Sequence, residues 1–577
     1  MTSLNPKRAC EPCRRRKIKC DGLPTCRNCS VAETACHYST PKKRGPKPAH
    51  WRNNRQRQRQ NSTSVATESS GADDPPAQPP VDEALFRSPF DNSPVLGTVT
   101  ANFLSESLTI QTETAVNIHL DLLRGLAAAA PADTVTSIAN HCISLYTQYL
   151  FGAIPVCHEP TLRATASRYF LQPDDEDDHS AHQSRIFHCF NSRCEREQIA
   201  ALREITILTA LCASVAYAVP AALLPSKHGI APLFLRAARS TLQIYEDYDL
   251  EHPNSSSLSI RLFLSSATQT ETGKHGVAFH TLNEAGLIAL RMRLYDESSL
   301  QGLDPIEETI LRNAFWQLYV CDKTALVMKG RPITIHETLF ESELTLQTRS
   351  RNCVPLFDEL WESSNAAVEK HLLEGFHIIR RLWAMAAQVI QAMEDSNPKD
   401  TWNTFVEPEA ARRRITQLSE AYFEMLTLTP NPPLDTETPE SSPTDIGQET
   451  SHHPSRLLQR QQTSYLITLH CIKIFVMSSA VQSGMTEVLG LSAEPRTLAM
   501  KQIELAQEFL NVLHTVPFLH VQAEGEHCAE KIRRVGSLLL RLECSSEDDT
   551  VKHRAKDCTM RFIKILVQLD SKATDLL

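Results

Sequence analysis

The sequence predicts three parts of different fold class: a small metal-stabilised head, a disordered linker and a large all-α domain. Six cysteines lie within the first 36 of 577 residues, and they are the basis for the head. Residues 61–98 are rich in Ser, Pro, Asp, Ala and Gln and cannot bury a core, which predicts the linker. From about residue 100, Leu, Ala, Glu and Arg dominate and no alternating apolar pattern persists, which favours helices.

The cysteines of the head have a spacing that is typical of metal ligands. The pattern C-x2-C-x6-C-x5-C-x2-C-x6-C consists of two C-x2-C-x6-C units joined by a short loop. Thiolates are soft ligands that suit zinc, and two cysteines separated by two residues can bind one ion. Two tetrahedral zinc ions need eight ligands, and six sulfurs supply eight only if two of them bridge. The pattern therefore predicts two zinc ions, held by Cys10, Cys13, Cys20, Cys26, Cys29 and Cys36.

A disulfide framework and a purely structural zinc site are the alternatives. Disulfide frameworks are typical of secreted chains, and the opening MTSLNPKRAC has no apolar segment of a secretory signal. A purely structural site would not explain the basic residues inside the first unit, which are Arg14, Arg15, Arg16, Lys17 and Lys19. A metal-braced fold with this much positive charge is suited to contact phosphate groups, so spacing and charge together favour nucleic-acid binding.

Charge also divides the chain into a head and a body. Residues 1–60 contain 16 Lys and Arg but three Asp and Glu, a net charge of +13 before metal and thiolates are counted. The whole chain carries −9, so residues 61–577 carry −22. A basic head on an acidic body indicates that the head alone contacts nucleic acid.

The head resembles the DNA-binding domain of fungal zinc binuclear-cluster transcription factors. All six cysteines, the basic run CRRRKIKC and Pro24 in the loop between the units match this family. The resemblance implies a zinc-stabilised binuclear cluster with two bridging and four terminal thiolates. Its ligands would be Cys10 and Cys26 as bridges, Cys13 and Cys20 on one ion, and Cys29 and Cys36 on the other.

The same resemblance implies that the basic run recognises DNA. Residues 14–19 would form a short helix that enters the major groove, where the family contacts a CGG triplet. Lys17 would contact the bases, with Arg16 beside it, since Lys and Arg donate to guanine O6 and N7. Phosphate contacts, which fix register but carry no sequence information, are expected from Arg14, Arg15 and Lys19. For any one of these residues the alternative is a solvated charge.

After the cluster, the chain departs from the many family members that pair through a coiled coil. Residues 45–75 are rich in Arg, Gln, Asn, Ser and Thr and contain no apolar heptad. Gly45 and the prolines of PKKRGPKP forbid a continuous helix. We interpret this segment as a basic linker that is compatible with nuclear import and extra phosphate contacts. The protein is expected to bind as a monomer or to dimerise through its body.

The body resembles the middle-homology regulatory domain of the same family over about residues 100–400. The resemblance rests on LFGAIPVCHEPTL, on ALREITILTALCA and most strongly on ILRNAFWQLYVCDKTALVMKGRPITI. In the last segment, Gly330 and Pro332 stop a helix whose apolar face is Ile306, Ile310, Leu311, Ala314, Phe315, Leu318 and Cys321. In the family this domain is regulatory and does no chemistry.

The expected domains follow from these patterns. Residues 1–40 form the cluster and 41–98 a basic, then disordered, linker. The helical middle-homology domain occupies 99–428, a disordered loop 429–456 and a C-terminal helical region 457–577.

Three other features have functional alternatives. Residues 174–178 contain the DDxxD motif of helical terpenoid synthases, but Pro173 and a following polar run favour an exposed acidic loop. Residues 205–225 are uncharged and long enough to span a bilayer, yet a buried core helix broken at Pro220 is favoured. A third metal could be held by His188, Cys189 and Cys194, although scattered cysteines are usually buried small hydrophobes. The sequence has no P-loop, GxGxxG, GxSxG or HExxH motif, so no enzyme is expected.

These observations predict a nuclear, zinc-dependent, sequence-specific transcription factor of a fungus, with no catalytic residues and no membrane partner. Its expected partners are double-stranded DNA with CGG-type sites, the transcription machinery and, if it dimerises, a second copy through the helical body. Activation is favoured over repression, with LVQLDSKATDLL and ECSSEDD as candidate activating segments. Its size and the PKKRGPKP segment resemble regulators of polyketide gene clusters, such as that of citrinin, or of sugar utilisation. The rival class is a helical enzyme that carries a zinc DNA-binding head.

Overall fold

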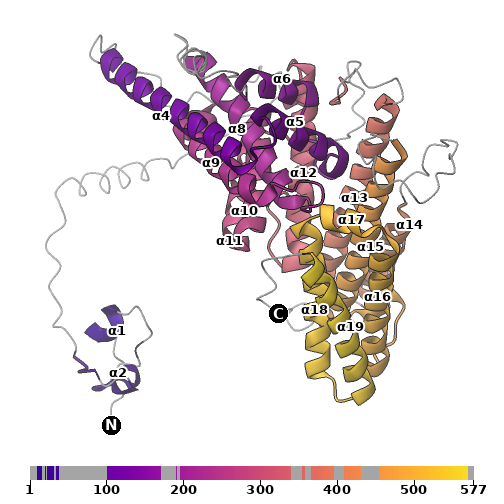
Figure 1. Cartoon of the computed structure of the whole chain (residues 1–577). Helices are drawn as coiled ribbons and strands as arrows, with labels where there is room; N and C mark the ends of the chain where they lie inside the picture. Colours follow the sequence, from indigo (N-terminus) through magenta and orange to yellow (C-terminus); the bar gives the residue numbers. More distant parts are fainter. Residues whose placement is uncertain are drawn as a thin grey trace, which may run out of the picture. The chain divides into compact units, whose positions relative to one another are not determined.

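A computed structural model shows two compact units, Met1–Val95 and Leu96–Leu577 (Figure 1). It describes residues 10–15, 20, 23–31, 34–37, 100–170, 190, 195–339, 354–357, 365–395, 408–429 and 454–569. Every secondary-structure element within these ranges is helical. The predicted linker, residues 41–98, lies outside them.

The described residues of the head include two short helices that begin directly after cysteines. α1 (Glu11–Arg15) follows Cys10 and α2 (Arg27–Val31) follows Cys26. In each case the carbonyl of the cysteine accepts a backbone N–H of the helix at 2.9 Å. The hydrophobic cluster of the described head consists of its cysteines, so zinc–thiolate bonds must replace an ordinary apolar core.

The second unit is a large assembly of helices, as the sequence predicts. Its first helices are α4 (Thr100–Ala129), α5 (Val135–Leu145), α6 (Glu159–Tyr169), α8 (Glu195–Ala218), α9 (Lys227–Glu251), α10 (Ser255–Thr272), α11 (His275–Arg291) and α12 (Pro305–Lys329). Then come α13 (Asn365–Glu394), α14 (Pro408–Thr427), α15 (Pro454–Ser483), α16 (Pro495–Thr515), α17 (Phe518–Ala523), α18 (Glu526–Ser545) and α19 (Asp549–Gln568). Short helical turns are η2 (Tyr146–Leu150), η4 (Glu297–Leu300), η5 (Glu337–Leu339) and η6 (Thr486–Leu489).

α8 is a largely buried helix in the first half of this unit. It packs against α9 and α10, and a hydrophobic core extends around it from α4 to α12. Residues 208–216 of α8 are buried on every side, and the helix ends at Ala218, just before Pro220. The predicted core helix is therefore confirmed. By length and apolar composition alone α8 and α15 could cross a membrane, but 78% and 61% of their most apolar stretches are buried inside this unit.

α12 has both the apolar face and the C-terminal end that the sequence predicts. Asp304 caps its first turn by accepting from the N–H groups of Ile306 and Glu307 at 3.0 and 3.3 Å. Gly330 ends the helix with a φ of 58°, in the left-handed region that glycine favours. The residues of the predicted face that are buried are Ile310, Leu311, Ala314, Phe315 and Leu318, while Ile306 and Cys321 are half-buried.

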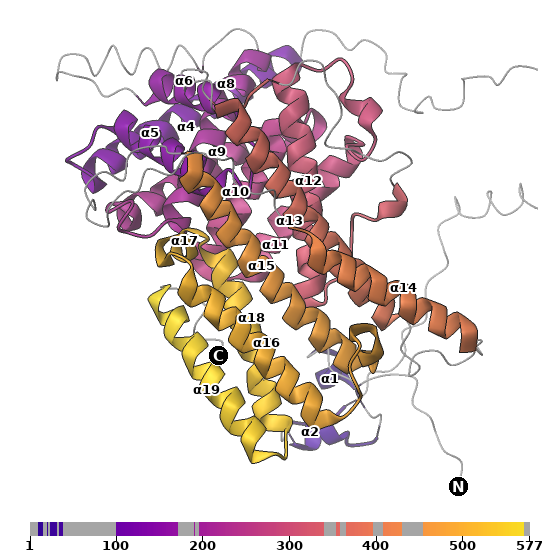
Figure 2. The ribbon, with the colours of Figure 1, turned by 90° about the vertical axis from the view of Figure 1, so that its right-hand side faces the viewer.

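The C-terminal helices form an elongated bundle, drawn in orange and yellow in Figure 2. α15 packs against α13, α16 and α18, so two further hydrophobic cores share this helix. The helices before and after residues 430–453 thus belong to one unit. α15 begins at Pro454, inside the loop expected at 429–456, and residues 430–453 of that loop lie outside the described part.

Candidate metal centre and nucleic-acid interface

The six cysteines of the head come together in two overlapping groups of four. Within each group the sulfur atoms lie within 4.8 Å of one another, and both groups contain Cys10 and Cys26. Six cysteines thereby offer the eight ligand places that two tetrahedral zinc ions need. No other group of this kind occurs among the residues that the structure describes. The two groups are Cys10, Cys13, Cys20 and Cys26, and Cys10, Cys26, Cys29 and Cys36.

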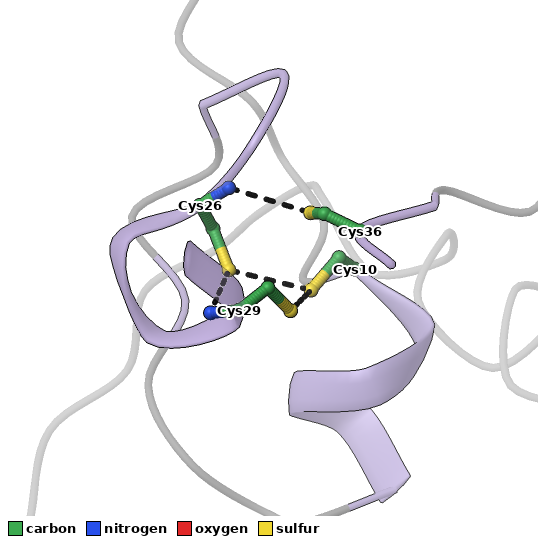
Figure 3. A group of neighbouring side chains, drawn as sticks. All are labelled: Cys10, Cys26, Cys29 and Cys36. Carbon is green, nitrogen blue, oxygen red and sulfur yellow. Dashed lines mark hydrogen bonds between the residues drawn. The ribbon is translucent and has the colours of Figure 1, made fainter. Parts of the chain in front are cut away.

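The sulfur atoms around the shared pair are in close contact. Sγ of Cys10 lies 3.6 Å from Sγ of Cys26 and of Cys29, and Sγ of Cys13 lies 3.5 Å from that of Cys26. Figure 3 shows the second group, in which backbone N–H groups also donate to sulfur. The N–H of Cys26 donates to Sγ of Cys36 at 3.3 Å, and that of Cys29 to Sγ of Cys26 at 3.4 Å. Such donors stabilise a thiolate.

The protonation of these thiols fits a metal-binding role. Burial raises the pKa of Cys10, Cys13 and Cys29, so these thiols stay protonated unless a cation is present. Burial also acts to raise the pKa of Cys26, but hydrogen bonds from its cysteine neighbours outweigh this and lower it. A divalent cation binds thiolates and releases their protons, which reverses the effect of burial. The donor set therefore fits zinc.

Two of the five predicted DNA-contacting residues are described, and both are exposed. Arg14 and Arg15 lie at the end of α1, and the Arg14 guanidinium is 3.2 Å from the carboxylate of Glu11. Glu11 is a site residue that sequence reasoning missed, although its position three residues before Arg14 could have indicated the ion pair. Three predicted residues lie outside the described part and stay predictions: Arg16, Lys17 and Lys19.

A backbone contact also ties the two cysteine units together. The N–H of Glu11 donates to the carbonyl of His37 at 2.9 Å, which joins the start of the first unit to the end of the second. α1 is therefore held both by the sulfurs and by the main chain, and the position of its arginines depends on the fold of the whole cluster.

Most of the described cysteines of the body are core residues. Cys157, Cys212, Cys471 and Cys528 are buried, and burial is the main reason why the pKa of each thiol is raised. They remain protonated and pack as small hydrophobic residues, as the sequence indicates. The acidic run at 174–178 and the candidate ligands of a third metal, His188, Cys189 and Cys194, lie outside the described residues.

Comparison with known families identifies both parts of the chain. The model of the fungal Zn(2)-Cys(6) binuclear cluster domain matches residues 8–45. The model of the fungal specific transcription factor domain matches residues 206–406, from within α8 to the residues before α14. The family model thus matches the later part of the stretch, about residues 100–400, over which the sequence resembles this domain.

Two curated relatives match short stretches of the chain. One uncharacterized transcriptional regulatory protein of Schizosaccharomyces pombe is 54% identical over 37 residues, which are 6% of this chain and 4% of that protein. Another from the same organism is 52% identical over 46 residues, which are 8% of each protein. The matched stretches thus cover less than a tenth of either relative, and they carry no information on target genes.

The two matches are to domains of fungal Zn(2)-Cys(6) transcription factors that carry a fungal-specific transcription factor domain. This is a family of nuclear transcription regulators, not of enzymes, and its six-cysteine cluster binds two zinc ions. The predicted fold class and cofactor are confirmed at this level. The finer resemblance to the regulator of the citrinin cluster has no support in these matches.

Proposed function

We propose that the chain is a sequence-specific DNA-binding regulator of genes transcribed by RNA polymerase II, acting mainly as an activator. The observation that supports this best is the overlap of two four-cysteine groups beside the exposed Arg14 and Arg15. A metal-braced cluster gives these cations fixed positions from which they contact phosphate groups of double-stranded DNA. The rest of the chain is acidic, so the head is the part whose net charge favours DNA.

In this proposal Cys10 and Cys26 bridge the two zinc ions. They are the members that the two four-cysteine groups have in common, which supports bridging roles. The terminal ligands are Cys13 and Cys20 on one ion, and Cys29 and Cys36 on the other. The bound zinc keeps all six sulfurs as thiolates and fixes the loop between the two units.

Lys17 is proposed to contact the bases of a CGG triplet, and Arg14 a phosphate. Lys17→Ala is expected to cost about 1–3 kcal/mol on a CGG-containing duplex and less on a random duplex, because it removes a base contact. Arg14→Ala is expected to weaken binding to both duplexes similarly and to flatten its salt dependence, because it removes a phosphate contact. Fluorescence anisotropy titrations with both duplexes at several salt concentrations measure these effects.

Glu11→Gln provides a control on the same helix. It releases Arg14 from its ion pair without removing any proposed DNA contact, so sequence preference should stay as in the parent protein. Equal losses for Lys17→Ala and Arg14→Ala on every duplex would contradict the assigned roles.

The head is proposed to be monomeric without the body. A fragment of residues 1–75 has no apolar heptad and carries 16 basic and three acidic residues before position 61, so two copies should repel each other. We expect it to occupy a single CGG triplet with modest affinity. Sedimentation of the fragment and of the full chain measures this directly, and a dimeric fragment would show that residues 37–75 contain the pairing element.

The candidate activating segments have different structural contexts. ECSSEDD, residues 543–549, spans the last residues of α18, the connection to α19 and the first residue of α19, where Asp548 caps α19 by accepting from the N–H of Thr550 at 2.8 Å. Part of its acidic character therefore serves the fold. LVQLDSKATDLL begins at Leu566 in the last turn of α19, and its residues from 570 on lie outside the described part.

The proposed targets are the genes of a secondary-metabolite cluster of the polyketide type, such as that of citrinin. Genes of sugar or carbon utilisation are the alternative, and both possibilities rest on resemblance in chain size and in the PKKRGPKP segment. Transcript profiling after deletion of the gene separates them. Loss of polyketide synthase transcripts supports the first, loss of glycosidase and transporter transcripts supports the second, and a rise of either set indicates repression.

A further inference from the structure

The outward face of α11 carries apolar side chains that the described parts of this unit leave exposed. Val277 and Leu287 are 51% and 67% exposed. With His280, Glu284 and Arg291 they recur at intervals of three and four residues, so they form one stripe along the helix. The opposite face packs against α10 and α12 and contains the buried residues Ala278, Ala285, Ile288 and Ala289.

This stripe is complementary to a second copy of itself in the antiparallel orientation. A twofold axis at the level of Leu282 places Val277 of one copy opposite Leu287 of the other, because both are five residues from the axis. The same axis places His280 opposite Glu284, since each is two residues from it. Twofold symmetry repeats both pairs, so the contact contains two apolar pairs and two imidazole–carboxylate pairs.

The carboxylate of Glu284, the acidic residue of this stripe, is fixed by a hydrogen bond from a buried arginine of α10. Arg261, which is fully buried, donates from Nε to Oε1 of Glu284 at 2.8 Å and from Nη1 to Asp249 at 2.6 Å. The second carboxylate oxygen of Glu284 can accept from an imidazole of another chain. At the edge of the stripe, a Cβ on Gly276 would have no atom within 4 Å, so the surface beside Val277 is open.

A comparable stripe on α19 does not have this self-complementarity. Met560 and Val567 are 48% and 69% exposed there, and the exposed charges beside them on the same face are two basic residues, Lys556 and Lys564, and one acidic residue, Asp557. Each copy of this face carries a net positive charge, so two copies repel each other, which disfavours pairing. Of these two exposed stripes, the one on α11, with its mixture of apolar, basic and acidic groups, is the one that fits a second copy of this chain.

We propose that α11 is the surface through which two copies of the chain dimerise, antiparallel and by the part of the stripe from Val277 to Leu287. The inference deepens the homodimer part of the proposed function by naming its surface. A helix of 17 residues is about 25 Å long, so this contact lies at the small end of specific interfaces. The dimer is therefore weak, forming at micromolar concentrations.

Sedimentation equilibrium of the full, zinc-loaded chain without DNA tests the surface. Leu287→Glu should lower the association constant by about tenfold or more, because it places a charge opposite Val277. Val567→Glu is the matched control, since it makes the same kind of change at an equally exposed apolar residue on α19 and should leave the dimer intact. His280→Glu should weaken the dimer by repelling Glu284 of the other copy, whereas His280→Lys should retain or strengthen it.

Cysteine cross-linking tests the orientation. With the exposed Cys544 replaced by Ser, the double variant Val277→Cys/Leu287→Cys should form a covalent dimer under mild oxidation, above the background of the parent chain. Neither single variant should do so, because identical positions lie about 15 Å apart along an antiparallel pair.

Three results would overturn the inference: a full chain that stays monomeric, a dimer that survives Leu287→Glu, or cross-links in the single-cysteine variants. Because these measurements contain no DNA, failure of CGG recognition and failure of this pairing are separate outcomes. A dimer that binds random and CGG duplexes equally would support the surface and contradict the proposed readout.

Discussion

Chelation of zinc is expected to unfold the head and abolish DNA binding while the helical body stays folded. The described head has a hydrophobic cluster made of its cysteines, so its folding free energy comes from zinc–thiolate bonds. Structural zinc supplies about 10–16 kcal/mol of apparent binding free energy near neutral pH, more than a unit of this size gains otherwise. The described part of the body contains three hydrophobic cores of its own, so its helical circular dichroism should persist.

Variants that each lack one of the six cysteines test which zinc ion that cysteine holds. Cys26 belongs to both four-cysteine groups, so Cys26→Ala should weaken both zinc sites and leave less than one zinc per chain. Cys36 belongs to one group, so Cys36→Ala should lower the content from two zinc ions toward one. Metal analysis of the purified chains and anisotropy titrations with a CGG duplex measure these losses.

Cys544→Ser is the control for the cysteine series. Cys544 is exposed on α18 and belongs to neither group, so its replacement should leave two zinc ions and full DNA affinity. Two zinc ions retained in Cys26→Ala, or a stable metal-free head, would contradict the bridging roles.

The head could be predicted from the sequence because ligand number and spacing leave few solutions. Six sulfurs for two tetrahedral ions require two bridges, and the structure brings the sulfurs into two groups that share two members. α12 was predictable for a different reason: its apolar residues follow the helical period, and Gly330 supplies the left-handed residue that ends it. In both cases the information is local.

The features that sequence reasoning missed depend on distant partners. The segment YEDYDLE of α9 contains Glu246, Asp247 and Asp249, and nothing local shows that Asp249 alone is fully buried. Its arginine partners lie 46 residues before it and 12 after it. Likewise, α11 is apolar on several sides in HGVAFHTLNEAGLIALR, and its exposed face is decided by where α10 and α12 pack.

Loss of the Asp249 carboxylate is expected to be the most destabilising single change in the body. Asp249 accepts from Arg203 Nη2 at 2.7 Å and from Arg261 Nη1 at 2.6 Å. It also accepts from the hydroxyl of Ser257 at 2.7 Å, so it connects α8, α9 and α10. Burial acts to lower the pKa of Arg261, but Asp249, together with Glu284, outweighs it and raises that pKa, so the guanidinium stays charged.

Asp249→Ala should therefore cost about 3–5 kcal/mol of unfolding free energy, because it leaves a fully buried guanidinium without its main counter-charge. Urea unfolding followed by circular dichroism measures the loss. Glu204→Ala, which removes an exposed ion pair with Arg168 at 2.9 Å, is the control and should cost less than about 1 kcal/mol.

The joint replacement Asp249→Leu/Arg261→Met distinguishes two explanations for the stability lost in Asp249→Ala: an uncompensated buried charge and lost hydrogen bonds. If the penalty in Asp249→Ala comes from an uncompensated buried charge, removing the arginine as well should recover much of the lost stability. If it comes from lost hydrogen bonds that tie α8 to α10, the double variant should be no more stable than Asp249→Ala. Asp249→Ala, Glu204→Ala and the double variant should all keep two zinc ions per chain. The replaced residues lie in the unit from Leu96 to Leu577, and the cysteine cluster lies in the other unit.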